Sequence, residues 1–365
     1  MKVICTQENL KNGLLTTGRI ISPSNTLPVL NNFLLKTEHG QLKISSTNLE
    51  IAITTQIRCK IEEEGEVTVY AKTFSDLVSN LPNTNLSLET KPGELKIETE
   101  SYHTSIKTLP AEDFPLIPQI EKNNTIVVSG KELKKALDQV IFAASNNQTQ
   151  PEISGIMFYF GKELKIAATD RYRLAEKKVV LEKKSEQEQI VIVPQKTAQE
   201  LSRIVGNLTP EANVEIIVNQ NQISFDINQT QIISRLVDGQ YPDYQQIIPT
   251  DFKVNIQVEK KPLVSALKAG GIFSQAGSSV VFGYEGGKIQ LSSESADVGS
   301  SQVVIPAEVG GEPGQLLLNF HYVLDCLNAL DVDKINIKII DDNSPALILP
   351  EGQQDYVYLV MPIKN

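Results

Sequence analysis

Cysteine and histidine are scarce in this sequence of 365 residues, and long hydrophobic runs are absent. The three cysteines, Cys5, Cys59 and Cys326, stand far apart, so they form neither a Cys-x-x-Cys metal motif nor an even-numbered disulfide framework. We interpret them as small core residues of a protein in a reducing compartment. No window approaches the roughly 18 apolar residues of a membrane span, and the N-terminus lacks the apolar run of a signal peptide. The sequence therefore predicts a soluble, cytoplasmic protein that does not bind a membrane.

The sequence also lacks the short motifs of common enzymes. It contains no Gly-x-x-x-x-Gly-Lys-Ser/Thr loop, no Gly-x-Gly-x-x-Gly after a predicted strand, no His-Glu-x-x-His and no Gly-x-Ser-x-Gly. The three histidines, His39, His103 and His321, are isolated, and we interpret each as a surface or packing residue. We therefore expect a non-catalytic binding or scaffolding protein that holds no metal and no cofactor.

What the sequence does contain is one module of about 120 residues that occurs three times. Each module has two similar halves, and each half has the pattern of a strand, a short amphipathic helix and several further strands. Leucines four residues apart mark the first helix of each module: Leu10 and Leu14, Leu133 and Leu137, and Leu263 and Leu267. The pattern predicts an α+β chain with six short helices and antiparallel sheets. We place the domains at residues 1–121, 122–248 and 249–365, in a rod or in a curved row.

One stretch, residues 166–175, is distinctive among the repeats. It has the pattern of a strand, a polar turn and a second strand, which predicts that Thr169, Asp170, Arg171, Tyr172 and Arg173 are displayed together at one edge. A plain structural interpretation is a hairpin tip in which Asp170 accepts from a nearby backbone N–H or from Arg173. Weaker copies occur at residues 44–49 and 291–295, but neither carries the Arg-Tyr-Arg cluster. Because only one of the three similar turns carries this cluster, the sequence favours a binding site at residues 166–175.

The formal net charge of −10 speaks against nucleic acid, because such a field repels phosphate at long range. The predicted helical windows nevertheless hold ten basic and seven acidic residues, which leaves +3 on the helices and −13 on the remainder; these windows are residues 7–16, 72–81, 131–143, 196–205, 259–271 and 320–330. An ordinary solvated helix face would account for this count. If the helices line a concavity, however, they form the part of the molecule that tolerates a phosphate backbone.

Several motifs in order resemble the bacterial sliding clamps, the β subunits of the replicative DNA polymerase. The resemblance covers all three modules and rests on residues 26–30 (Thr-Leu-Pro-Val-Leu), 108–115, 168–175, 236–244, 322–330 and 360–363 (Val-Met-Pro-Ile). It implies a head-to-tail homodimer of three-domain chains, forming a ring around duplex DNA that tethers the polymerase. DNA polymerase, a clamp loader and repair proteins would bind through short linear peptides.

The resemblance also implies three sets of site residues. The partner-peptide pocket would be formed by Ile153, Thr169, Arg171, Tyr172, Arg173, Leu174, Pro242, Ile247, Val360, Met361, Pro362 and Ile363. The dimer interface would be formed by Thr104 and Ile106 of one subunit with Ile272 and Phe273 of the other. The DNA-facing residues would be Lys72, Lys131, Lys134, Lys135, Lys196, Arg203, Lys260, Lys261 and Lys268.

The sequence departs from the family at three places. Arg171 and Tyr172 stand where relatives often have Gly or Ser followed by His, which predicts a narrower pocket or another preferred peptide. Thr104 replaces a larger apolar residue, and the loop 146–152 has amides and a carboxylate where some relatives place aromatics. Two alternatives from other classes remain: a multi-domain scaffold that never closes into a ring, and an enzyme whose site lies between modules.

Overall fold

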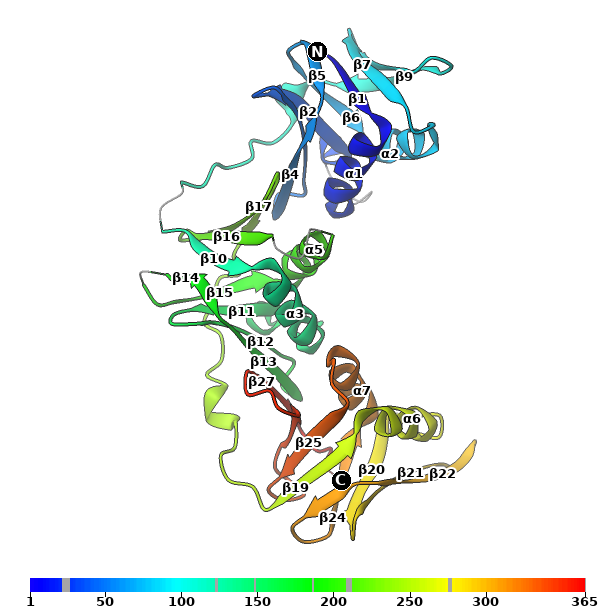
Figure 1. Cartoon of the computed structure of the whole chain (residues 1–365), viewed down its shortest axis with the longest axis vertical. Coiled ribbons are helices and arrows are strands. Elements are labelled where there is room, and N and C mark those ends of the chain that lie inside the picture. Colours follow the sequence, from blue (N-terminus) through cyan, green and yellow to red (C-terminus); the bar gives the residue numbers. More distant parts are fainter. Residues whose placement is uncertain are drawn as a thin grey trace. The chain divides into compact units, whose positions relative to one another are not determined.

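The computed structural model describes residues 1–21, 27–121, 124–147, 149–185, 187–207, 212–274 and 278–364. Five residues that the sequence predictions use lie outside the described residues: Thr26, Lys122, Asn123, Gln148 and Asn365. The described chain is a mixed α and β structure, as predicted, in which a strand, a helix and then further strands follow one another six times (Figure 1).

The first module contains two such halves. Its elements are β1 (Lys2–Thr6), α1 (Gln7–Thr17), β2 (Asn32–Glu38), β3 (Gln41–Thr47), β4 (Ile51–Arg58) and β5 (Lys60–Glu63), then β6 (Glu66–Tyr70), α2 (Ala71–Asn80), β7 (Asn85–Lys91), β8 (Glu94–Glu98) and β9 (His103–Leu109).

The second module repeats the order. Its elements are β10 (Ile126–Ser129), α3 (Gly130–Val140), β11 (Gly155–Phe160), β12 (Leu164–Thr169), β13 (Arg173–Val179) and β14 (Leu181–Lys183), then β15 (Gln189–Pro194), α5 (Gln195–Gly206), β16 (Asn213–Val218), β17 (Gln222–Ile227) and β18 (Thr230–Arg235). One further helical turn, α4 (Pro151–Ser154), was not predicted; it begins with a proline, whose fixed φ suits the first helical position.

The third module closes the series. Its elements are β19 (Val254–Glu259), α6 (Lys260–Gly271), β20 (Ser279–Glu285), β21 (Lys288–Ser295), β22 (Gly299–Pro306) and β23 (Glu308–Gly310), then β24 (Gly314–Asn319), α7 (Phe320–Ala329), β25 (Lys334–Ile339), β26 (Ala346–Pro350) and β27 (Tyr356–Val360).

The leucines that predicted the helices form their buried faces. Leu10, Leu133, Leu137, Leu263 and Leu267 are all fully buried. Residues at i and i+4 lie on one side of a helix, so each pair faces a sheet while the opposite side stays polar. Burial of one leucine contributes about 1.5–3 kcal/mol, and these contacts therefore fix the rotation of each helix.

The chain divides into two compact units, and the division falls inside α3 and α5. Unit 1 comprises residues 1–131 and 203–236, and unit 2 comprises residues 132–202 and 237–365. The middle module is thus shared between the two units. The units are described separately below.

Unit 1 is built on one continuous antiparallel sheet. Its strand order is β10-β16-β17-β18-β4-β3-β2-β6-β9-β8-β7-β1-β5. The pairing of β18 with β4 joins the middle module to the first, with Ile232 opposite Ile53. Beside that pair, the hydroxyls of Thr55 and Thr230 lie 2.8 Å apart. This sequence-distant ladder was not predictable from periodicity, because periodicity identifies strands but not their distant partners.

Unit 2 contains two sheets. One has the strand order β15-β11-β12-β13-β27-β26-β25-β19-β23, and the other has the order β22-β21-β20-β24. The pairing of β13 with β27 joins the middle module to the last strand of the chain, with Leu174 opposite Leu359. That junction is where the strand–turn–strand stretch and the C-terminal segment come together.

Candidate functional site

The turn between β12 and β13 has a twin in the first module, between β3 and β4. In both turns a threonine hydroxyl donates to the carbonyl four residues later: Thr169 to Arg173, at 2.7 Å, and Thr47 to Ile51, at 2.9 Å. The residue after each threonine, Asp170 or Asn48, accepts two backbone N–H groups through one side-chain oxygen. Such local side-chain bonds hold the turn without help from the rest of the chain.

The next position in both turns has a positive φ, 79° at Arg171 and 75° at Leu49. This conformation is uncommon outside glycine, and the same hydrogen bonds impose it in both copies. The predicted role of Asp170 as an acceptor from the backbone and from Arg173 is confirmed.

The prediction that all five polar residues are displayed was wrong. Arg171 is exposed, and Tyr172 retains 62% of its surface. Thr169 is buried, and the side chains of Asp170 and Arg173 are only 14% and 11% exposed. The turn therefore presents two side chains to solvent, and its other polar groups face the protein.

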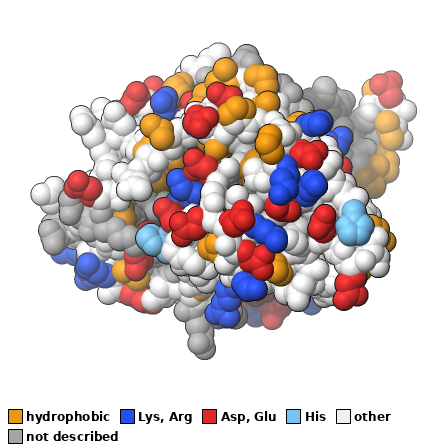
Figure 2. Space-filling model, turned by 90° about the horizontal axis from the view of Figure 1, so that it is seen from above, with side chains coloured by type: hydrophobic (Ala, Val, Ile, Leu, Met, Phe, Trp, Pro, Cys, Tyr) orange, Lys and Arg blue, Asp and Glu red, His pale blue; other side chains and the backbone are white. Residues whose placement is uncertain are grey.

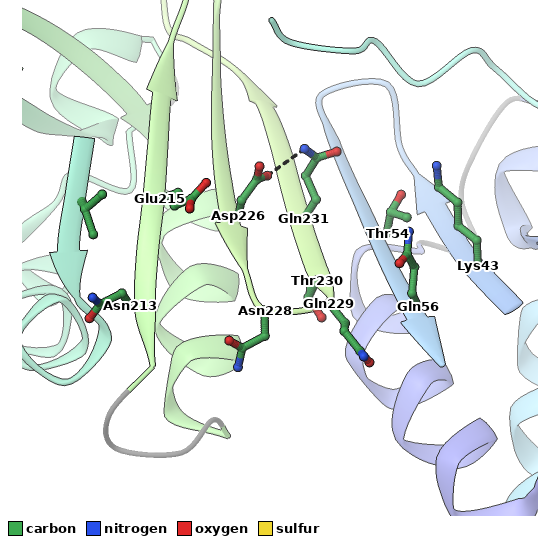
Figure 3. Close-up of a pocket in the computed structure, with 11 residues that line it drawn as sticks. Lys43, Thr54, Gln56, Asn213, Glu215, Asp226, Asn228, Gln229, Thr230 and Gln231 are labelled. Atoms are coloured by element: carbon green, nitrogen blue, oxygen red, sulfur yellow. Dashed lines mark hydrogen bonds between the residues drawn. The ribbon is translucent and has the colours of Figure 1, made fainter. Parts of the chain in front are cut away.

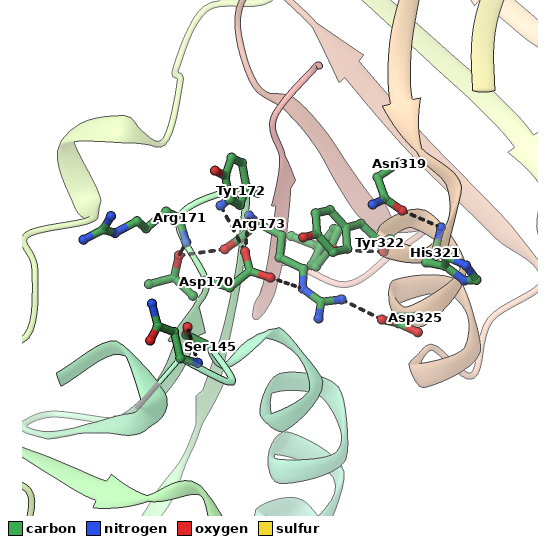
Figure 4. Close-up of polar contacts among 12 residues, drawn as sticks. Ser145, Asp170, Arg171, Tyr172, Arg173, Asn319, His321, Tyr322 and Asp325 are labelled. Atoms are coloured by element: carbon green, nitrogen blue, oxygen red, sulfur yellow. Dashed lines mark hydrogen bonds and ion pairs between the residues drawn. The ribbon is translucent and has the colours of Figure 1, made fainter. Parts of the chain in front are cut away.

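Arg173 is enclosed by groups from three elements (Figure 4). Its Nε donates to Asp170 Oδ2 at 2.9 Å, and its Nη1 donates to Asp325 Oδ2, on α7, at 2.6 Å. The guanidinium also lies over the ring of Tyr322, 4.4 Å from its centroid, and 5.6 Å from that of Phe142. Asp325 and Tyr322 lie about 150 residues from Arg173 in sequence, so no local pattern indicated this contact.

The charge of Arg173 is well compensated. Burial opposes the charge, but the hydrogen bond to Asp325 and the nearby carboxylates outweigh burial and raise the pKa of the guanidinium. Because the Asp325 side chain is 42% exposed, loss of this pair should cost less than the roughly 3–5 kcal/mol of a fully buried pair. Arg173 therefore fixes the β12–β13 turn against α7.

The C-terminal segment follows the same turn. The N–H of Met361 donates to the carbonyl of Tyr172 at 2.8 Å, and the N–H of Ile363 donates to the carbonyl of Leu317 at 2.8 Å. Val360 and Pro362 are buried, whereas Met361 is partly exposed and Ile363 is 36% exposed. The last strand ends at Val360, and the chain beyond it continues beside Tyr172 rather than within a sheet.

Two tyrosines hold the segment that carries Pro242 and Ile247 over the same hairpin. The hydroxyl of Tyr244 donates to Glu176 Oε2 at 2.5 Å, and that of Tyr241 donates to the carbonyl of Ala167 at 3.5 Å. Pro242 is exposed, and Ile247, at the end of a single 3-10 turn (Gln245–Ile247), is 52% exposed.

Ile153 lies on α4 and is 6% exposed, and its carbonyl accepts the N–H of Ser145. Leu174, on β13, is also buried. Unit 2 thus brings the hairpin, the Pro242–Ile247 segment and the C-terminal segment together.

The basic residues predicted to face DNA lie on four helices and differ in their surroundings. Lys72, Lys131, Lys196, Lys261 and Lys268 are exposed. Three others are engaged within the protein: Lys134 pairs with Asp138, Arg203 donates to the carbonyl of Thr16 at 2.7 Å, and Lys260 donates to the carbonyl of Leu330. Lys135 is half-buried.

The residues predicted for the dimer interface lie in different units. Thr104 and Ile106 are on β9, where residues 103–107 pair with β8 and Thr108 and Leu109 pair with β6. Ile106 is only 8% exposed and packs in the core of unit 1. Ile272 follows α6 and is 69% exposed, and Phe273 is partly exposed.

Unit 1 contains a surface pocket with a volume of about 580 Å³ (Figure 3). Its lining is polar and includes Lys43, Glu215 and Asp226 among threonines and amides from β3, β4 and β16–β18. Asp226 accepts from Gln231 at 2.7 Å inside it. Because this lining offers few apolar anchors, the pocket does not suit a peptide with hydrophobic anchors.

Two kinds of feature are absent from the described ranges. No helix there is both long and apolar enough to cross a membrane. No group of three or more His, Cys, Asp or Glu side chains in those ranges is arranged to hold a metal ion.

Three family models match the chain in succession. They describe the N-terminal, central and C-terminal domains of the DNA polymerase III beta subunit, and they match residues 1–118, 127–243 and 245–364. The chain is 30% identical to the beta sliding clamp of Synechocystis sp., covering 100% of this chain and 99% of that protein. It is 27% identical to the beta sliding clamp of Staphylococcus aureus, covering 96% and 95%.

Solved structures agree with this assignment. The structure matches that of a Pseudomonas aeruginosa sliding clamp bound to griselimycin with a TM-score of 0.96, at 25% identity and over all of both chains. It matches the sliding clamp of Bacillus subtilis with a TM-score of 0.95, at 26% identity and over 100% and 99% of the two chains. The chain therefore belongs to the DNA polymerase III beta subunit family, the non-catalytic sliding clamps that act as processivity factors of DNA replication.

Proposed function

We propose that two copies of this chain close head to tail into a ring around duplex DNA and act in the cytoplasm. The proposal takes the domains as residues 1–121, 122–248 and 249–365, close to the ranges of the three family models. A ring holds DNA by topology, so it needs no tight or sequence-specific contact, and a large specific interface would hinder sliding.

Basic side chains on the helices would face the DNA. The exposed members, Lys72, Lys131, Lys196, Lys261 and Lys268, support this role because lysine binds phosphate without reading bases. Lys134, Lys135, Arg203 and Lys260 would contribute positive potential rather than direct contacts, since three of them bond within the protein. On the face that Figure 2 displays, acidic and basic side chains are interspersed, and neither sign forms a continuous patch.

The subunits would meet through strand edges and apolar side chains. Residues 103–107 of β9 lie in one unit, and the edge strand β22 and exposed Ile272 lie in the other. An open strand edge invites pairing with another chain. We place Thr104 and Ile106 of one subunit against Ile272 and Phe273 of the partner subunit.

Polymerase, clamp loader and repair proteins would bind through short peptides at the site on unit 2. The observation that carries this proposal is the hydrogen bond from Met361 to the Tyr172 carbonyl, because it joins the C-terminal segment to the β12–β13 turn. Ile247 is exposed on the segment that Tyr241 and Tyr244 hold to the same hairpin, and Met361 is partly exposed. Two or three buried anchors supply about 3–9 kcal/mol, part of which offsets the ordering of the peptide, so we expect binding that is at best micromolar.

Calorimetry with a synthetic peptide that carries Gln, two Leu and one Phe tests the site. We expect Ile247→Asp to weaken binding at least about tenfold, because a charge would replace an apolar contact. Removal of residues 361–365 should have the same effect. Leu49→Asp is the matched control: Leu49 is 48% exposed, against 52% for Ile247, and it lies in the twin turn of unit 1. Equal binding by Ile247→Asp, by the truncated chain and by the control would place the partner site elsewhere.

A further inference from the structure

The basic residues of the hairpin formed by β12 and β13 are all partnered within the protein, with one exception. Lys165 lies over the ring of Tyr159, Lys177 pairs with Asp355, and Lys178 lies 3.9 Å from Glu163. Arg173 is held by Asp170 and Asp325, as described above. Among these basic side chains of the described hairpin, only that of Arg171 has no ion pair, hydrogen bond or ring contact.

Neither the adjacent Asp170 nor Asp243 forms an ion pair with Arg171. Asp170 already accepts two backbone N–H groups and the Nε of Arg173. Asp243, in the Pro242–Ile247 segment, accepts from Gln246 at 2.7 Å. In Figure 4 the side chain of Arg171 extends away from the cluster around Arg173.

The direction of the Arg171 side chain is set by its backbone. Its N–H donates to Thr169 Oγ1 at 3.1 Å, and the hydrogen bonds of the turn hold φ at 79°. The twin turn holds Leu49 in the same way, so the conformation belongs to the fold and the guanidinium is what distinguishes this copy. A charge on a rigid turn loses little backbone entropy when it meets a ligand.

We propose that Arg171 selects partner peptides that carry a carboxylate beside their apolar anchors. This inference rests on the peptide site proposed above. The guanidinium presents a planar set of N–H donors that matches a carboxylate in two-point contact, and no carboxylate of the described chain occupies it. Tyr172, adjacent and exposed, provides an aromatic face for the neighbouring part of the peptide.

The test uses paired peptides. One set carries Gln, two Leu and one Phe as anchors, with Asp placed in turn at each other position, and the second set has Asn in place of Asp. We expect the wild-type protein to prefer the Asp peptide at one or more positions by about three- to tenfold in 50 mM salt, with a smaller preference in 500 mM salt. Arg171→Gln should abolish the preference, and Arg171→Lys should keep part of it, because a point charge lacks the two-point contact.

Three outcomes would overturn the inference. If the wild-type protein shows no preference at any position, or if Arg171→Gln keeps the preference, another residue or none reads the carboxylate. If Arg171→Gln weakens binding to a short DNA duplex and leaves the peptides unaffected, Arg171 binds phosphate instead. If no peptide of either set binds the wild-type protein, the proposed peptide site itself fails, which distinguishes that failure from a failure of selectivity alone.

Discussion

At the residue scale, the buried charges of β13 hold the candidate peptide site in shape. Lys177 is fully buried and pairs with Asp355, just before the last strand. Glu176 is 4% exposed and accepts the hydroxyl of Tyr244. Burial, followed by the charge of Glu176, raises the pKa of that phenol, so Tyr244 remains a neutral donor. The Lys177–Asp355 pair holds the start of the C-terminal strand β27 to β13, and the Tyr244–Glu176 hydrogen bond holds the Pro242–Ile247 segment to the same strand.

The first prediction concerns the Tyr244 hydroxyl. Tyr244→Phe leaves the Glu176 carboxylate buried without this donor, so we expect the free energy of unfolding to fall by about 1–3 kcal/mol. Tyr241→Phe is the control, because the hydroxyl of Tyr241 contacts backbone groups, the carbonyl of Ala167 at 3.5 Å and the N–H of Thr169, rather than a buried carboxylate. Urea unfolding of both variants measures the difference. Equal midpoints for the two variants would show that the Tyr244–Glu176 contact contributes little.

The local part of this arrangement was predictable, and the distant part was not. The sequence predicted the hairpin and the acceptor role of Asp170, because Asx turns depend on neighbouring residues. It did not predict that Arg173 faces Asp325 and Tyr322 on α7. The residues around an arginine beside a turn do not indicate whether its side chain points to solvent or contacts a residue far away in the sequence.

At the element scale, periodicity predicted the six longer helices, and the structure confirms them within about one residue at most ends. For example, the window 72–81 corresponds to α2 at 71–80. Apolar spacing sufficed because each helix buries one face on its own module's strands. The strand pairs β18–β4 and β13–β27 were not predicted, because register between distant strands is set by tertiary packing.

The proposed dimer leads to a prediction about Ile272 and Phe273. Replacing both with Asp places two charges where we expect an apolar contact, and each lost side chain removes roughly 1.5–3 kcal/mol of burial. We therefore expect the variant to be monomeric at micromolar concentration in light scattering, and the wild-type protein to be a dimer. Leu116→Asp with Val180→Asp is the matched control: both residues are highly exposed and lie outside the proposed interface. A wild-type monomer at that concentration, or a dimeric Ile272→Asp/Phe273→Asp variant, would exclude the interface.

At the scale of the whole molecule, the net charge of −10 and the proposed binding to DNA are compatible. A ring that is held on DNA by topology needs only a local surface that tolerates phosphate. The acidic residues elsewhere in the chain limit non-specific binding to nucleic acid. Direct binding of the free protein to short linear duplexes should accordingly be weak and should decrease steeply with salt. The three-module repeat was visible in the sequence, but closure into a ring was not, since it depends on contacts between chains.

The most direct test of the central claim compares retention on circular and linear DNA. The protein is loaded onto nicked circular DNA with a clamp loader and ATP, and free protein is removed by gel filtration; the circle is then cut once with a restriction enzyme. Encirclement predicts stable retention on the circle at a salt concentration that abolishes direct binding, and rapid loss after the cut because the ring slides off the ends. Equal retention on circular and linear DNA would contradict it.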